Sequence, residues 1–218
     1  QLEIPEMCGP ETPILYIEMD GTGVPTVKAE TVGRAGKRPD QPAHTREVKL
    51  GCVFTQTKVD EQGRPLRDAD STSYVAAIET AQEFGPRLYA EARRRGWSRA
   101  RKKVVIGDGA PWIWNLAQQH FPGAIQIVDL FHAREHLWEL AAKLFPHSDP
   151  DKKRGLAKML ALLDDGRITQ LVAGLRACQA NEPRLLGLAN KQADYFERNA
   201  ERMNYPQYRS QGLFVGSG

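Results

Sequence analysis

Three aspartates stand where a short β-rich segment gives way to a turn or a helix. Asp20, Asp108 and Asp129 each follow such a segment, over residues 13–19, 103–107 and 124–128. Carboxylate oxygens are the ligands that hard divalent cations prefer. Because ligand sites of open α/β sheets lie at the strand ends, the pattern predicts one site built from acidic side chains there.

Asp20 and Asp108 share a further feature, because glycine follows each of them directly. A single Asp-Gly pair is also common in turns, so either aspartate alone fits a turn-capping role. Two carboxylates about 5 Å apart would repel by roughly 3 kcal/mol at an effective dielectric of 20, and a bound cation offsets that repulsion. We therefore predict that Asp20 and Asp108 converge as metal ligands.

The helix expected after Asp129 carries other candidate side chains. His132 and His136 are four residues apart, a spacing that can bind zinc, but no further ligand is evident. Glu135 lies between them and is predicted to be a surface or supporting helix residue. Three tryptophans fit either the core or a stacking contact with an unpaired base, namely Trp112, Trp114 and Trp138.

The elements that position these residues are predicted from periodicity and turn residues. Strands are expected over residues 13–19, 47–59, 103–107 and 124–128, the last leading into Asp129, and the second is expected to be antiparallel to the first. The segment 21–46 is predicted to be an exposed loop or hairpin, and 212–216 a short return to the sheet. Helices are expected over 73–95, 112–120, 131–145, 151–164, 167–180 and 183–203.

The helix expected over 73–95 has a predicted cap at Ser71 or Thr72, and Pro86 should kink or split it. Its predicted buried face consists of Tyr74, Ile78, Ala81 and Leu88.

Two stretches concentrate basic side chains. The first lies within residues 21–46, and the second, 93–103, has seven basic residues and no acidic one. Such runs are commonly solvated ends of helices and strands, and they also fit contacts to nucleic-acid phosphates. The candidate DNA-binding residues are Lys28, Arg34, Lys37, Arg38, Arg46, Arg93, Arg94, Arg95, Arg99, Arg101, Lys102 and Lys103.

Composition sets the remaining bounds. The chain has 218 residues, 41% hydrophobic and 26% charged, which is typical of one globular domain with room for an insertion. No apolar run approaches the roughly 20 residues that span a membrane. The cysteines form no close pair, which argues against a disulfide framework or a zinc site and fits a reducing cytosol.

The order of the predicted elements resembles the ribonuclease H-like fold. That fold class is α/β, with a mixed sheet, flanking helices and here an all-α insertion after the third strand that ends in aspartate. More narrowly, the segments Tyr16–Pro25, Val105–Ala110 and Asp129–His132 look like bacterial insertion-sequence transposases of the DDE class, of the ISKra-type group.

The resemblance implies metal-dependent DNA chemistry. In such enzymes two aspartates and a glutamate bind two Mg²⁺ or Mn²⁺ ions, which activate water or a DNA 3′-hydroxyl for attack on a phosphodiester. Asp20 matches the first catalytic aspartate and Asp108 the second. Asp129 and His132 match an Asp-x-x-His element, and we expect them to order the site or contact DNA.

The third carboxylate has no match among residues 1–218. Gly216-Ser-Gly218 resembles the stretch that precedes it, so the glutamate is expected a few residues later, and the chain is interpreted as a fragment, inactive or weak alone. Neither Glu135 nor Glu139 lies where the family places it. The predicted parts are an incomplete catalytic core over 1–145, a helical insertion over 146–205 and a return segment over 206–218.

The function implied is that of a transposase catalytic domain for DNA strand cleavage and strand transfer. Its expected partners are transposon ends, target DNA and further copies of itself on DNA, with no membrane, in the cytoplasm at the nucleoid. The alternative is a non-enzymatic DNA-binding or assembly domain on the same fold. An unrelated phosphohydrolase fits less well, because Asp20-Gly-Thr lacks the second aspartate of an Asp-x-Asp nucleophile motif.

Overall fold

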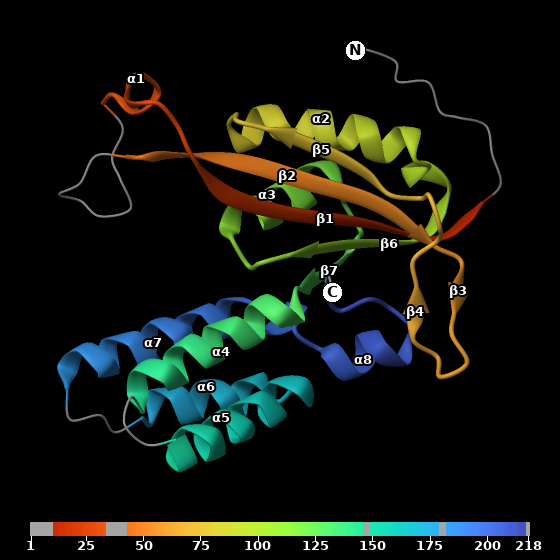
Figure 1. The fold of residues 1–218 in the computed structure, drawn as a ribbon. Helices are drawn as coiled ribbons and strands as arrows, with labels where there is room; N and C mark the ends of the chain where they lie inside the picture. Colours follow the sequence, from red (N-terminus) through yellow and green to blue (C-terminus); the bar gives the residue numbers. More distant parts are fainter. Residues whose placement is uncertain (1–10, 34–42, 146–148, 179–181, 217–218) are drawn as a thin grey trace. The chain divides into compact units, whose positions relative to one another are not determined.

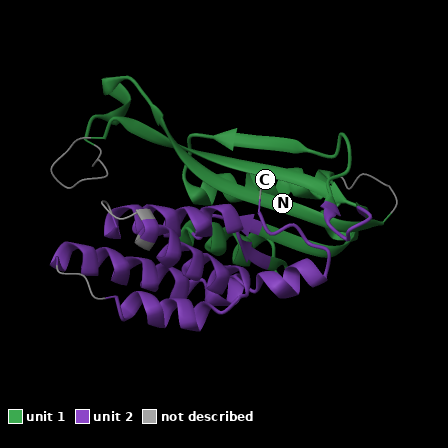
Figure 2. Ribbon diagram, turned by 60° about the horizontal axis from the view of Figure 1, so that its bottom comes forward, with its two compact units in different colours: residues 1–58, 66–105, 110–125 green, residues 59–65, 106–109, 126–218 purple. Residues whose placement is uncertain are grey.

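A computed structural model describes residues 11–33, 43–145, 149–178 and 182–216. The chain divides into two compact units, which Figure 2 shows in separate colours. Unit 1 comprises residues 1–58, 66–105 and 110–125, and unit 2 comprises residues 59–65, 106–109 and 126–218. Asp20 therefore belongs to unit 1, whereas Asp108, Asp129 and His132 belong to unit 2.

Unit 1 contains most of one β-sheet. The five-stranded sheet has the order β5-β2-β1-β6-β7, and β2 pairs antiparallel with both β1 and β5. In Figure 1 the arrows of β1 and β6 run the same way, so the sheet is mixed. The strands are β1 (Thr12–Pro25), β2 (Thr45–Gln56), β5 (Ser73–Ala77), β6 (Ala100–Gly107) and β7 (Ile125–Val128).

β1 is longer than predicted, and Asp20 lies inside it rather than at its end. The pairing with β2 continues past Asp20, which is opposite Leu50, to Pro25 opposite Thr45. A side chain at Gly21 would come within 2.5 Å of Glu47 Oε1, so glycine leaves the space that Glu47 occupies. The Asp-Gly-Thr-Gly stretch is therefore strand, because its glycines accommodate the side chains of β2.

The helices of unit 1 include α2 (Ala81–Arg94), which lies against β2. A Cβ at Gly51 would be 2.5 Å from Leu88 Cδ1, so the missing side chain allows helix and strand to approach closely. Leu88 and Phe84 are fully buried. The other helical segments are α1 (Lys28–Thr31), η1 (Trp97–Arg99) and α3 (Pro111–His120).

The prediction of one helix over residues 73–95 is wrong for the first residues of that range. Residues Ser73–Ala77 form β5, and Tyr74 is exposed rather than buried. The helix begins later because Thr80 and Glu83 form a capping box, in which each side chain bonds the other's backbone N–H. Pro86 removes one backbone donor, but α2 continues through it to Arg94.

Unit 2 is mainly helical, as predicted for the chain after Asp129. In Figure 1, α4, α5, α6 and α7 are neighbouring helices. α6 contacts α7, and Leu171 and Leu175 on α6 and Phe196 on α7 are buried. The segments are α4 (Leu130–Leu144), α5 (Asp149–Asp164), α6 (Ile168–Arg176), α7 (Pro183–Arg198), η2 (Ala200–Arg202) and α8 (Tyr205–Ser210). A separate hairpin pairs β3 (Lys58–Val59) with β4 (Pro65–Leu66).

The C-terminal segment returns to the end of β7. The backbone N–H of Leu130 donates to the carbonyl of Val215, with the two atoms 2.8 Å apart. A Cβ at Gly216 would lie 2.7 Å from the Phe131 ring and 3.2 Å from Asp129 Oδ1. Residues 213–216 therefore reach Asp129 without forming a strand, and their predicted return to the sheet stays a prediction. Among the helices described, none is long and apolar enough to cross a membrane.

Candidate functional site

Asp108 follows the last residue of β6, and its backbone is held from the helical block. The hydroxyl of Tyr195, on α7, donates to the Asp108 carbonyl oxygen at 2.7 Å. Gly109 has φ +96°, and a Cβ there would come within 2.7 Å of the Tyr195 ring. Only glycine combines that backbone conformation with such a close ring. The Asp108–Gly109 turn is therefore fixed, while the Asp108 side chain stays half-buried.

Tyr195 is itself held by a ring stack. The ring of His136, on α4, lies 4.0 Å from that of Tyr195 with 25° between their planes. His136 Nδ1 is 2.8 Å from Gln192 Oε1. Burial lowers the pKa of His136 despite that hydrogen bond, and burial raises the pKa of the Tyr195 phenol. At neutral pH the stack is therefore two neutral rings, and the tyrosine keeps its proton for the Asp108 carbonyl.

Asp129 caps α4. Its Oδ1 accepts from the backbone N–H groups of Phe131 at 2.7 Å and His132 at 3.3 Å, and the residue is 3% exposed. A carboxylate at a helix N-terminus satisfies donors that the helix leaves free and complements its dipole. Asp129 therefore orders the first turn of α4, and its role in a metal or DNA site stays a prediction.

Two further tyrosines bind carbonyl groups of β7. Tyr205 donates to the carbonyl of Val128 at 3.1 Å, and Tyr208 donates to that of Gln126 at 3.3 Å. Together with Tyr195 they form a set that we call the tyrosine donors. The sequence offers only a weak signal for this set, the spacing of tyrosines in α7 and α8.

A cavity of about 210 Å³ opens next to Asp129, on the exposed side of α4. Its lining includes two exposed aromatic side chains, Phe131 at 48% and Trp138 at 45%. They are seven residues apart, so they lie on the same face of α4. Trp114 is buried instead. His132 Nδ1 lies 3.5 Å from Glu135 Oε2, and both line the same cavity. Of the tryptophans left open by the sequence, Trp138 is the exposed one here.

Asp20, in unit 1, is half-buried, and its Oδ1 accepts from the backbone N–H of Gly21 at 2.7 Å. Side chains alternate along a strand, so Asp20 and its partner Leu50 share one sheet face. The other face carries Lys49, whose Nζ lies 2.6 Å from Glu47 Oε2 and 4.8 Å from the centre of the Trp112 ring. No local pattern in the sequence indicates this ion pair between buried Lys49 and exposed Glu47.

β1, which carries Asp20, is next to β6 in the sheet order, and Asp108 follows the last residue of β6. Asp20 and Asp108 fall in different units, and their convergence stays a prediction. Within the described ranges, no three His, Cys, Asp or Glu side chains are grouped as a metal site.

The basic residues of 93–103 lie at the end of α2 and the start of β6, whereas Asp108 follows the end of that strand. Several contact the protein: Arg94 pairs with Glu91, Arg95 donates to the Ser71 carbonyl, and Arg101 lies 3.5 Å from Glu11. Lys103 Nζ lies 5.1 Å from the centre of the Trp97 ring, and Lys102 is exposed. Arg93 and Arg99 belong to the same segment.

In the first basic stretch, Lys28 is exposed on α1, and Arg46 lies 3.5 Å from Glu30. Arg34, Lys37 and Arg38 lie outside the described residues. The described parts of both stretches thus include cations with acidic partners as well as exposed ones.

Comparison with known proteins gave limited similarity. No family model matches the chain, and no curated protein matches it. Among solved structures, the chain is similar to one described as "Drosophila P element transposase strand transfer complex", with a TM-score of 0.34 and 10% sequence identity. The alignment covers 90% of this chain and 51% of that chain, so this chain spans about half its length. A similarity at this level carries no information about activity.

Proposed function

We propose that this chain carries part of the catalytic site of a DNA transposase of the DDE class, on a ribonuclease H-like fold. The supporting observation is the sheet order, in which β1 with Asp20 lies beside β6, the strand that leads into Asp108. The finer identity proposed is a bacterial insertion-sequence enzyme of the ISKra type. Its activity is cleavage of DNA strands and their transfer to a target.

Asp20 and Asp108 fit Mg²⁺ or Mn²⁺ by their chemistry. Mg²⁺ is commonly held by one or two carboxylates, with waters and substrate phosphates completing its ligands. Two ions, once bound, would supply an activated nucleophile and charge stabilisation at the phosphodiester. The chain's own contribution is orientation, since the backbone of Asp108 is fixed by Tyr195 and by the conformation of Gly109.

The region around Asp129 has a supporting role in the proposal. Asp129 fixes the first turn of α4, and that turn carries Phe131 and His132 at the cavity. We assign His132, with exposed Phe131 and Trp138, to contacts with DNA near the reacting strand. Exposed aromatic rings stack on unpaired bases, and a histidine can donate to a phosphate or a base.

The third carboxylate is proposed to follow Gly218. The return segment supports this, because it brings Val215 and Gly216 beside Leu130 and Asp129. Reading the nucleotides after the codon for Gly218 tests the proposal. A glutamate codon within a few positions is expected, and a stop codon at that point would contradict it.

Exposed cations of the 93–103 segment are proposed to contact DNA phosphates. Changing Arg94, Arg101 and Lys102 together to alanine is expected to weaken DNA binding at low salt. Each lost phosphate contact reduces the magnitude of the slope of log K against log salt by about 0.7 to 0.9. The triple variant is therefore expected to reduce that slope by about 2 to 3. Fluorescence anisotropy with labelled DNA over a salt series measures this slope.

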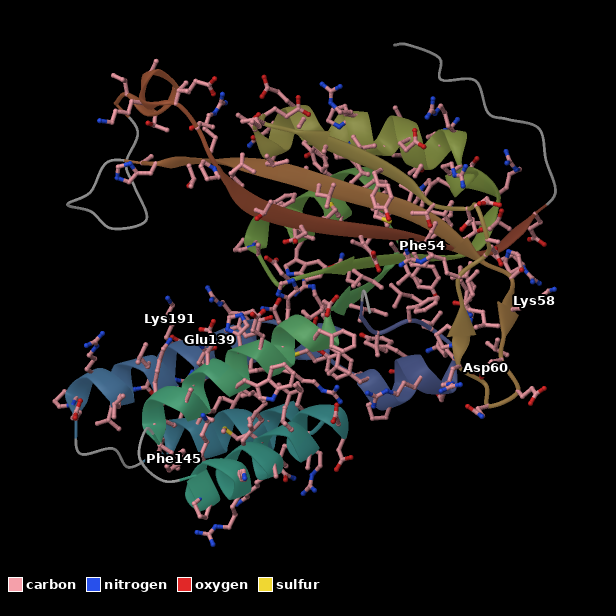
Figure 3. The ribbon with its side chains drawn as sticks, viewed as in Figure 1. Phe54, Lys58, Asp60, Glu139, Phe145 and Lys191 are labelled. Atoms are coloured by element: carbon pink, nitrogen blue, oxygen red, sulfur yellow. The ribbon has the colours of Figure 1, made fainter. Side chains whose placement is uncertain are left out.

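A control variant with the same change of charge replaces exposed cations of the unit 2 helices, Lys143, Arg184 and Lys191, by alanine; Figure 3 labels Lys191 on α7. The control is expected to keep most of the slope. Equal losses in the two triple variants would show that net charge alone is responsible, and would overturn the assignment of the 93–103 segment.

A metal-dependent strand-transfer assay separates the enzyme from the alternative of a DNA-binding or assembly domain. With Mg²⁺ or Mn²⁺, the expected result is joined DNA products, formed by copies of the protein assembled on transposon ends. In the cell, we place this assembly at the nucleoid. DNA binding that persists without any joined or cleaved product, in a protein that includes the third carboxylate, would favour the alternative.

A further inference from the structure

We propose that Tyr195 is a positioning residue for Asp108, so that the helical block sets the orientation of a metal-ligating carboxylate. This inference rests on the proposed function, because it takes Asp108 as a ligand. It assigns a task to α7, whose residues lie far from Asp108 in sequence. Tyr195 touches the Asp108 backbone and acts through that residue.

The contact has two parts that restrain different bonds. The Tyr195 hydroxyl donates to the Asp108 carbonyl oxygen at 2.7 Å, which limits rotation of the peptide group after Asp108. The ring lies where a side chain on Gly109 would be, within 2.7 Å of the Cβ position. Gly109 at φ +96° therefore stays in that turn.

The donor itself is rigid, which is what positioning requires. Tyr195 is 9% exposed, stacks on His136 at 4.0 Å and packs edge-on against Phe196 at 5.2 Å. A hydroxyl on a side chain locked by neighbouring rings holds its partner more precisely than one on a free rotamer. His136 in turn bonds Gln192, which lies on α7 with Tyr195.

The burial of Tyr195 does not by itself require this role. Tyr208 is also buried and donates to backbone carbonyls, those of Gln126 and Glu201. Neither acceptor belongs to a proposed ligand, so Tyr208 is a matched comparison. A purely structural role predicts similar behaviour of the two hydroxyls, whereas positioning predicts a difference in metal affinity.

The test measures Mn²⁺ affinity by electron paramagnetic resonance for the wild type, Tyr195→Phe and Tyr208→Phe. A small misplacement of a reacting or ligating group has large effects, so an affinity loss of about tenfold is expected for Tyr195→Phe. Tyr208→Phe is expected to bind as the wild type does. Placing 4-aminophenylalanine at position 195 restores a donor on a similar ring, and it should recover most of the affinity.

The outcomes separate the inference from the proposed function. Mn²⁺ affinity lost in Asp108→Asn and kept in Tyr195→Phe would overturn the positioning role and leave the metal site standing. Affinity unchanged in Asp108→Asn would overturn both. If Tyr195→Phe does not fold, the 4-aminophenylalanine protein decides, because wild-type affinity with its donor supports positioning and a tenfold loss in the folded protein overturns it.

Discussion

In a protein that includes the third carboxylate, replacing Asp108 with asparagine is expected to abolish metal-dependent strand transfer, with a rate at least about a thousandfold below that of the unsubstituted protein, or about 4 kcal/mol in activation free energy. Asparagine has the same shape but no charge, so it removes a metal ligand and leaves the turn intact. The Tyr195 hydrogen bond is to the backbone carbonyl of Asp108 and survives the substitution. Single-turnover assays with pre-cut DNA ends measure the joining step.

Asp20→Asn is expected to give the same loss, and the double variant should be no worse than either single one, because groups that act on one site are not additive. The control is Asp165→Asn, which changes an exposed aspartate of the α5–α6 turn. Joining that persists in Asp20→Asn but not in Asp108→Asn would show that the two residues do not serve one site.

Gly109→Ala is expected to give the largest loss of stability near the site. Alanine at a positive φ costs about 1–2 kcal/mol, and its Cβ would meet the Tyr195 ring at 2.7 Å, so about 3 kcal/mol of unfolding free energy should be lost in total. The ring cannot move away easily, because His136 and Phe196 pack against it. Urea denaturation followed by circular dichroism measures the change.

Gly63→Ala is the matched control, because Gly63 has φ +76° and no atom within 4 Å of its Cβ position. This variant should lose only the unfolding free energy that alanine costs at a positive φ, about 1 kcal/mol. The difference between the two variants isolates the contact with Tyr195. Equal losses would mean that the ring adjusts without cost and that the turn is held less firmly than its geometry indicates.

The helical part of the fold could be predicted because its signals are local. Pro183 lies at the start of α7, Gly166 follows α5, and apolar residues recur with helical spacing between them. The position of Asp129 before α4 was also predictable, since aspartate is a preferred N-cap residue. These features depend on neighbours within a few residues.

The features that were missed depend on partners distant in sequence. The spacing of Tyr74 and Ile78 predicts a helix where β5 lies, whereas the pairing of Tyr74 with Cys52 fixes a strand. The extension of β1 past Asp20 depends on Glu47 and Thr45 lying over its glycines. The tyrosine donors join residues up to 87 positions apart, as for Tyr195 and Asp108. No short-range pattern encodes such pairs.

The shared metal site is tested most directly by a crystal structure of the protein with Mn²⁺, using the anomalous signal of the ion. The expected result is a peak about 2.1 Å from a carboxylate oxygen of Asp20 and from one of Asp108, bridging the two side chains. A peak that touches one aspartate and excludes the other, or carboxylates directed away from each other, would contradict the proposed site.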